Sequence, residues 1–308
     1  MILLLSGGVG GAKLAEGVAS LTDRLGIIGN TGDDLEWFGL RVCPDLDIVM
    51  YTLAGIVDRE HGWGLAGDTA HTLEMLARYG QDEWFRMGDR DLATALLRTT
   101  WLRSGLTLTE ATERLCQALG LRVRLMPMSD DAVRTIIHTP AGELDFQEYF
   151  VARGARDVVR GVRFAGVDRA TLPPSLPELI ESAELIIVAP SNPIVSIGPI
   201  LAVPGLREAI RRSPAPKIGV SPLVRGAALK GPAASMMQSL GHRADAAGVA
   251  ALYSDFLDVF VIDEMDVDLT VDVRALGMDV QVRPTIMTDA AQKRDLAAEI
   301  LTMGECRP

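Results

Sequence analysis

Short apolar runs alternate along the chain with amphipathic segments. Each run is four residues long and largely aliphatic, as is typical of strands buried on both faces of a parallel sheet. The stretch between the first two has apolar residues at helical spacing, with Leu14, Val18 and Leu21 on one side. This pattern predicts an α/β fold with a Rossmann-like, doubly wound, mainly parallel sheet. The predicted strands are residues 2–5, 26–29, 185–188, 217–220 and 259–262.

The middle of the chain has a different pattern. Three amphipathic helices are predicted first, at residues 69–79, 88–103 and 107–119. Four short strands with turn signals between them follow. We therefore expect residues 1–55 and 171–308 to form the nucleotide-binding core and residues 56–170 to be an inserted helical and small β lobe. The short strands are residues 122–126, 133–138, 143–151 and 162–164, and the buried helix faces are expected at Leu73, Leu76, Leu92, Leu96 and Leu97.

The composition of the chain argues against several classes of binding partner. The 308 residues are 48% hydrophobic and 23% charged, which fits a folded globular protein and argues against disorder. A net charge of −11 argues against binding nucleic acid or an anionic membrane surface, both of which need a basic surface. The three cysteines, Cys43, Cys116 and Cys306, are too few and too scattered for a disulfide framework. The first apolar run leads straight into glycines, as a strand does and a signal peptide does not, and no apolar segment is long enough to span a bilayer. The expected location is the cytoplasm.

A glycine-rich turn joins the first strand to the first helix. Such a turn directs backbone N–H groups at the helix N-terminus toward an anion, so a phosphate or diphosphate is the expected ligand. The spacing is G-G-x-G-G, which matches neither the dinucleotide fingerprint nor the P-loop. A tight turn that only packs the helix on the sheet is the alternative. The turn glycines are Gly7, Gly8, Gly10 and Gly11.

Carboxylates follow the second strand. Asp33 and Asp34 end the loop after residues 26–29, and Asp45 and Asp47 come shortly afterwards. Carboxylates beside a phosphate site predict a divalent metal. The alternatives are a turn with a helix cap for the first pair and two solvated loop acids for the second. The secondary structure of residues 48–53 is left open by the pattern.

Three further segments carry candidate chemistry. Ser191 and Asn192 lie between two prolines after the strand at residues 185–188, where ligands bind in open α/β sheets. Trp63, in a glycine-rich loop, is a candidate stacking wall for a flat ring, although a loop tryptophan also commonly closes the edge of a core. Residues 84–91 collect two aromatic, two arginine and two aspartate residues at a helix entrance, where Asp89 is a plausible N-cap.

Seven motifs in order along the chain resemble the 2-phospho-L-lactate transferase family, which includes the phosphoenolpyruvate transferase of coenzyme F-420 biosynthesis. Any one of them is weak, but together they cover nearly the whole chain. They are residues 6–13 (SGGVGGAK), 30–34 (NTGDD), 43–47 (CPDLD), 62–64 (GWG), 88–91 (GDRD), 127–131 (PMSDD) and 190–193 (PSNP) with 196–199 (SIGP).

The resemblance implies a reaction. A phospho-carboxylic acid group passes from a guanosine diphosphate conjugate to the ribityl hydroxyl of the deazaflavin Fo, GMP is released, and Mg²⁺ is required. The positions that match Asp47 and Arg86 contact the deazaflavin in the family's pattern. Asp33, Asp34 and Asp47 are our candidates for holding the metal or orienting the hydroxyl. The four turn glycines with Ser191 and Asn192 are the candidates for the nucleotide, and a homodimer is a further expectation.

Two other classes of protein share parts of this sequence pattern. A non-catalytic nucleotide-sugar-binding regulator of the gluconeogenesis-factor type would need the glycine turn and the Ser191-Asn192 loop, but not Asp47, Arg86 and the cluster at residues 84–91. A nicotinamide dehydrogenase is disfavoured because the dinucleotide fingerprint is absent.

Overall fold

A computed structural model describes residues 1–305, and Cys306 lies outside the described residues. Its centre is a seven-stranded sheet in the order β14-β13-β10-β9-β1-β2-β5, and every neighbouring pair is parallel. The predicted doubly wound α/β fold is confirmed, and three predicted strands match residue for residue. The strands are β1 (Ile2–Ser6), β2 (Leu25–Gly29), β5 (Arg124–Pro127), β9 (Leu185–Val188), β10 (Lys217–Val220), β13 (Val259–Ile262) and β14 (Asp279–Val282).

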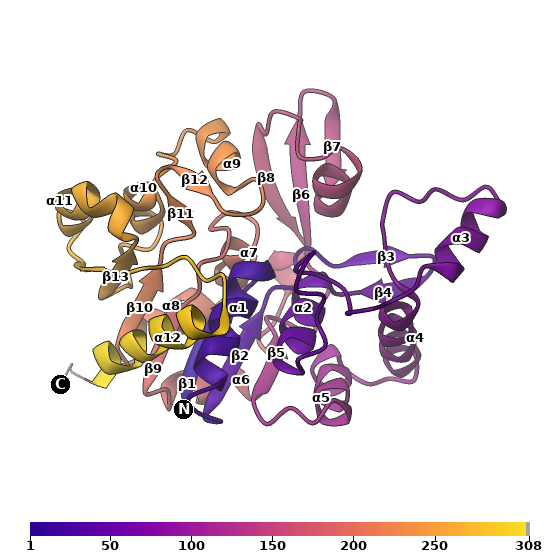
Figure 1. Ribbon diagram of the computed structural model, residues 1–308, viewed down its shortest axis with the longest axis horizontal. Helices are drawn as coiled ribbons and strands as arrows, with labels where there is room; N and C mark the ends of the chain where they lie inside the picture. Colours follow the sequence, from indigo (N-terminus) through magenta and orange to yellow (C-terminus); the bar gives the residue numbers. More distant parts are fainter. Residues whose placement is uncertain (306–308) are drawn as a thin grey trace.

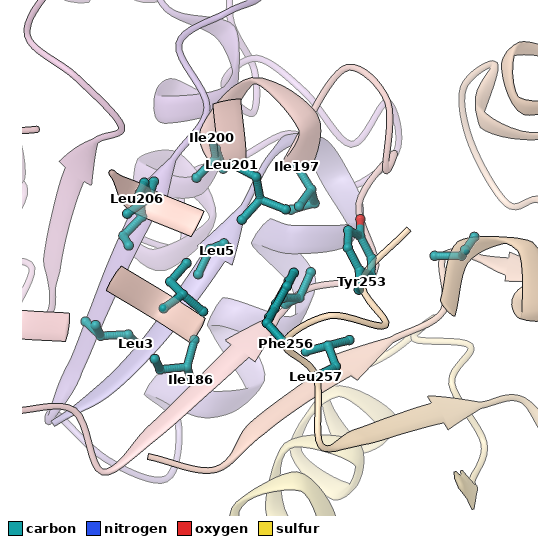
Figure 2. Packing of buried hydrophobic residues seen from close by; sticks show 14 of the residues in the cluster. Leu3, Leu5, Ile186, Ile197, Ile200, Leu201, Leu206, Tyr253, Phe256 and Leu257 are labelled. Carbon is teal, nitrogen blue, oxygen red and sulfur yellow. The ribbon is translucent and has the colours of Figure 1, made fainter. Parts of the chain in front are cut away.

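Helices cover both faces of this sheet (Figure 1). Successive residues of β1 pack into opposite cores: Leu4 joins the core under α1, whereas Leu3 and Leu5 join the core on the other face, which Figure 2 shows. Continuous apolar strands are therefore required, as the sequence indicated. One face carries α1 (Gly8–Ala19), α2 (Pro44–Leu53), α5 (Leu108–Ala118) and α12 (Ala290–Glu305); the other carries α6 (Leu176–Glu181), α7 (Ile197–Ala202), α8 (Leu206–Arg212), α10 (Ala246–Ala251) and α11 (Thr270–Arg274).

The segment left open by the sequence is helix α2. Pro44 occupies its first turn, where a missing N–H costs nothing, and Asp45 and Asp47 also lie in that turn. Both aspartates are buried, so the alternative of two solvated loop acids is wrong. Since the segment is helical, the two carboxylates do not share the common face that an extended segment would give them.

A lobe beside the sheet holds α3 (His71–Arg78), α4 (Asp89–Arg103) and the hairpin of β3 (Leu35–Trp37) and β4 (Leu40–Val42) (Figure 1). The two helices are capped reciprocally. Asp68 accepts the Arg90 N–H of α4 at 2.9 Å, and Asp89 accepts the Thr72 N–H of α3 at 2.9 Å. The N-cap of α4 is Gly88, so the prediction that Asp89 caps its own helix is wrong.

The buried face of α4 also differs from the prediction. Leu96 and Leu97 are 54% and 46% exposed, and the buried positions are Ala95, Arg98 and Thr99. Leu92 packs against a buried cluster as predicted, but Leu96 and Leu97 do not, because in this part of the helix the basic residue Arg98 takes the interior side.

The remaining β structure is a three-stranded antiparallel sheet in the order β7-β6-β8. Two expectations for this region are corrected. The strand predicted at residues 122–126 is β5, which is an edge of the central sheet, and residues 148–152 form a single π-helical turn instead of strand. The division into core and inserted lobe stays a prediction. The strands are β6 (Arg134–Thr139), β7 (Gly142–Asp145) and β8 (Gly161–Ala165).

Between β10 and α10 the chain forms a small hairpin and a helix above the carboxyl end of the sheet (Figure 1). No helix in residues 1–305 is both long and apolar enough to cross a membrane. The hairpin strands are β11 (Leu223–Val224) and β12 (Ala227–Ala228), the helix is α9 (Ala233–Ser239), and 3-10 turns lie at Val167–Arg169 and Glu264–Leu269.

Candidate active site

A cavity of about 690 Å³ opens where the carboxyl ends of the central strands meet. Strand β1 has β2 on one side and β9 on the other, so the strand order reverses here, at the point where open α/β sheets bind ligands. The cavity wall includes most of the residues chosen from the sequence. These are Gly7, Gly8, Gly10, Asp33, Asp47, Trp63, Arg86, Ser191 and Asn192; Gly11 and Asp34 are not in the wall.

The glycine turn is held tightly against the loop after β9. Ser191 Oγ donates to the Gly7 carbonyl at 2.7 Å and accepts the Gly7 N–H at 3.2 Å. A Cβ on Gly10 would lie 2.1 Å from the Pro190 carbonyl oxygen, and one on Gly11 would lie 2.2 Å from Ser6 Oγ. Gly10 and Gly11 therefore serve close packing, while the turn as a whole still lines the cavity. Its role in binding phosphate stays a prediction.

Asn30, at the end of β2, joins the two loops. Its amide donates to Asp45 Oδ2 at 2.9 Å and to the Val195 carbonyl at 3.2 Å, and its Oδ1 accepts the Gly32 N–H at 2.8 Å. Asn30 is fully buried, so these bonds fix Asp45 against the loop that carries Asn192. This orienting role was not predicted, although Asn30 belongs to one of the matching motifs.

Asp33 and Asp45 are buried carboxylates in the cavity wall. Burial raises the pKa of Asp33 well above its ordinary value, and the charge of Asp45 raises it further; burial also raises the pKa of Asp45 to about 6. Asp33 Oδ1 has no hydrogen-bond partner. Two such carboxylates, one with an unsatisfied oxygen, suit a hard divalent cation, because Mg²⁺ is usually held by one or two carboxylates together with substrate phosphates.

Asp34 lies on the other side of the loop and outside the cavity wall. It pairs with Arg41 at 2.8 Å and accepts the Cys43 thiol at 3.0 Å. Burial raises the pKa of Asp34 to about 6, although the Arg41 charge opposes that shift. Its contacts are those of a residue that ties the β3-β4 hairpin to α2.

Asp47 is bound by an arginine that the sequence did not suggest. Arg98 of α4 is 1% exposed; its Nη1 donates to Asp47 Oδ2 at 3.1 Å and its Nη2 donates to Oδ1. Burial lowers the pKa of Arg98, but the charge and hydrogen bonds of Asp47, together with the charges of Cys43 and Asp34, outweigh this, so the net shift is upward. The signal was present in the sequence: Arg98 lies between Ala95 and Thr99 on the small-residue face of its helix.

A second carboxylate, Asp91, lines the cavity together with Asp47. Asp91 accepts the Tyr51 hydroxyl at 2.8 Å, and Tyr51 is also 2.7 Å from Thr94 Oγ1. Burial, followed by the charge of Asp47, raises the pKa of Asp91 to about 7. Asp91 and Tyr51 both line the cavity. The sequence indicated Asp91 only as one of the two aspartates at a helix entrance.

Aromatic rings and one cation also line the cavity. Trp84 and Phe85 contact edge to face at 5.6 Å, and Phe146 and Phe150 stack with 5.5 Å between ring centroids. Arg86 has no carboxylate within 4.0 Å among the residues that the structure describes. The rings of the π-helical segment were not predicted, because that segment was taken for a strand.

Trp63 is in the wall but 48% exposed, at the rim beside His61. Its role as a stacking wall stays a prediction.

The described side chains contain no group of three or more His, Cys, Asp or Glu residues arranged to bind a metal. The prediction that Asp33, Asp34 and Asp47 hold a metal stays untested, but Arg41 and Arg98 already occupy two of the three.

Comparison with known proteins shows the family of this chain. The family model described as 2-phospho-L-lactate transferase CofD matches residues 2–301. The chain belongs to the 2-phospho-L-lactate transferase family. It is 44% identical to the phosphoenolpyruvate transferase of Streptomyces coelicolor, over 99% of this chain and 98% of that protein. It is 37% identical to the 2-phospho-L-lactate transferase of Methanosarcina mazei, over 96% of this chain and 98% of that protein.

The fold also resembles that of a solved UPF0052 family protein from Bacillus halodurans. That structure has a TM-score of 0.66 and 15% identity, and the match covers 97% of this chain and 98% of that one. Similarity at this identity concerns the fold alone. Membership of the transferase family therefore rests on the family model and the curated relatives.

Proposed function

We propose that this family member transfers a phospho-carboxylic acid group from its guanosine diphosphate conjugate to the ribityl hydroxyl of the deazaflavin Fo, in coenzyme F-420 biosynthesis. The group is that of phosphoenolpyruvate or 2-phospholactate, the two acids in the names of the relatives. The hydroxyl oxygen attacks the phosphorus that carries the acid, the bond to the GMP oxygen breaks, and the hydroxyl proton is lost.

One observation carries this proposal: a single cavity is lined by two chemically different groups of residues and by carboxylates. The glycine turn and the Ser191-Asn192 loop suit a nucleotide. The rings of Trp84 and Phe146, with Arg86, suit a flat, polar heterocycle. A two-substrate transfer requires this arrangement, because both reactants must lie together in order to react.

Asp33 and Asp45 would hold Mg²⁺ in the cavity. When bound, the ion would neutralise charge that develops on the diphosphate. Asp47, which Arg98 holds in place, would orient the acceptor hydroxyl, and Arg86 would contact the deazaflavin. Asp34 is assigned a structural role, because Arg41 and Cys43 occupy its carboxylate.

The test uses the fluorescence of the deazaflavin. Fo quenching should report binding in the presence of Mg²⁺ and GDP, and mass spectrometry of the product with each donor conjugate should identify the acid transferred. The absence of detectable Fo binding under these conditions would remove the transferase proposal and leave a nucleotide-binding regulator as the better candidate.

A further inference from the structure

Two lysines line the cavity near the glycine turn. Lys13 lies in α1 and Lys230 follows β12, and both line the cavity. The Lys13 ammonium donates to the Met287 carbonyl at 2.7 Å, and that of Lys230 donates to the His61 carbonyl at 2.7 Å. A Cβ on Gly62 would lie 2.7 Å from Lys230 Nζ and 3.6 Å from Val9 Cγ1, so this ammonium lies beside the turn itself.

Neither lysine is neutralised by a carboxylate. In the described part of the chain, no Asp or Glu oxygen lies within 4.0 Å of either ammonium, whereas neighbouring Lys293 pairs with Glu16 at 2.6 Å. Glu16 is shared in turn with Arg59 at 2.9 Å. Burial, followed by the charges of Lys293 and Lys230, lowers the pKa of Lys13. Positive charges that repel one another at a cavity wall indicate an anionic ligand between them.

Lysines are rare in this chain, and half of them line the cavity. Only four of the thirty basic residues in this acidic chain are lysines, and two of these four line the cavity. A lysine ammonium has three N–H donors, and the carbonyl anchors use one on each side chain, which leaves two for a ligand. The anchors also hold the ammonium groups in place, since Lys13 is fixed to the chain that leads into α12 and Lys230 is fixed to the loop across the cavity mouth.

We propose that Lys13 and Lys230 bind the diphosphate of the nucleotide donor over the Gly7–Gly10 turn. This rests on the proposed function and adds a pair of side-chain cations to the backbone donors expected there. It places the two phosphates between the lysines and the carboxylate pair Asp33 and Asp45. The lysine ammonium groups would thus bind the nucleotide directly, independently of a metal at Asp33 and Asp45.

The experiment measures binding to the full chain by isothermal titration calorimetry, using inorganic pyrophosphate, GDP and guanosine, with and without Mg²⁺. Lys13→Met and Lys230→Met should each weaken pyrophosphate and GDP binding about tenfold or more, and guanosine binding should not change. Arg122→Met is the matched control, because Arg122 is an exposed cation paired with Asp23 at the opposite, amino-terminal edge of the sheet. It should bind all three ligands as the wild type does.

The two Lys230 variants allow the test to be read even if Lys13→Met does not fold. Lys230 is exposed, so Lys230→Met tests the proposal even if Lys13→Met unfolds, and Lys230→Arg should restore most of the affinity by keeping the charge. Wild-type GDP affinity in both methionine variants, or no pyrophosphate and GDP binding by the wild type, would overturn the lysine site. Lysine-dependent pyrophosphate binding by a protein that does not bind Fo would support the lysine site and refute the transferase proposal.

Discussion

The buried Asp47-Arg98 pair gives the sharpest quantitative expectation. Replacing Arg98 by methionine keeps the length of the side chain but leaves Asp47, which is 5% exposed, without its cation. Breaking a buried ion pair by removing one partner typically costs about 3–5 kcal/mol. Since domains are stable by only about 5–15 kcal/mol, this is a large fraction of the free energy of unfolding.

The unfolding entropy of a chain of this length converts that loss into a fall in Tm of about 5–8 °C. The loss should also depend on pH. Arg98→Met would leave a buried negative charge without a cation, and acid neutralises such a charge, so the variant should regain stability as the pH falls. Urea denaturation at pH 5 and pH 8 measures both effects, and the deficit should be smaller at pH 5.

A double variant separates charge from packing. Adding Asp47→Asn to Arg98→Met removes the orphaned charge, so the double variant should be more stable than Arg98→Met alone at pH 8 by at least about 1 kcal/mol, although it should lack turnover. Arg103→Met, at the exposed end of the same helix, is the control and should cost less than about 1 kcal/mol. If Arg98→Met is as stable as this control and shows no extra pH dependence, the pair does not carry the energy assigned to it.

Three further outcomes are expected. Gly10→Ala should destabilise the fold by about 1–3 kcal/mol, because its Cβ would lie 2.1 Å from the Pro190 carbonyl oxygen; an unchanged urea midpoint would contradict this contact. Asp91→Asn should gain stability relative to the wild type as the pH rises from 5 to 8, because a carboxyl whose folded-state pKa is raised to about 7 loses its stabilising contribution through that range; parallel denaturation curves would contradict the shift. Arg86→Met should weaken Fo binding about tenfold with GDP affinity unchanged, measured by fluorescence quenching and calorimetry, and equal losses for both ligands would point to a collapsed cavity instead.

The central sheet could be predicted because its physical signal is local. A strand covered on both faces must be largely apolar, and residues 185–188, 259–262 and, after Lys217, residues 218–220 meet that demand without help from the rest of the chain. The edge strand β5 was found but assigned to the wrong sheet, since strand pairing depends on partners distant in sequence. Leu96 and Leu97 of α4 were wrongly placed on the buried face, although Leu92 does pack on the interior, because hydrophobicity cannot anticipate a buried arginine whose partner, Asp47, lies on another helix.

The candidate site was predictable in position but not in pairing. Motifs at the ends of β1, β2 and β9 gave the correct wall of the cavity, since parallel strands bring their carboxyl ends to one edge. Which carboxylates carry uncompensated charge could not be read from the sequence. That depends on Arg41 and Arg98, which are brought to Asp34 and Asp47 only by the folded lobe, and it shifts the proposed metal pair to Asp33 and Asp45.

The charges that remain unpaired explain how so acidic a chain can accept a polyanion. Arginines neutralise Asp34 and Asp47, which hold the lobe together, whereas Asp33, Asp45 and Asp91 face the cavity and have no ion-pair partner among the described residues. Lys13 and Lys230 also face the cavity without a carboxylate partner in the described part of the chain. Uncompensated charge of both signs is costly in the folded protein alone and becomes favourable only with a bound ligand that carries phosphate and cation together. On this argument, GDP with Mg²⁺ should raise the Tm of the wild type more than it raises the Tm of either lysine-to-methionine variant, because only the wild type offers the ligand both lysine charges together with the carboxylates.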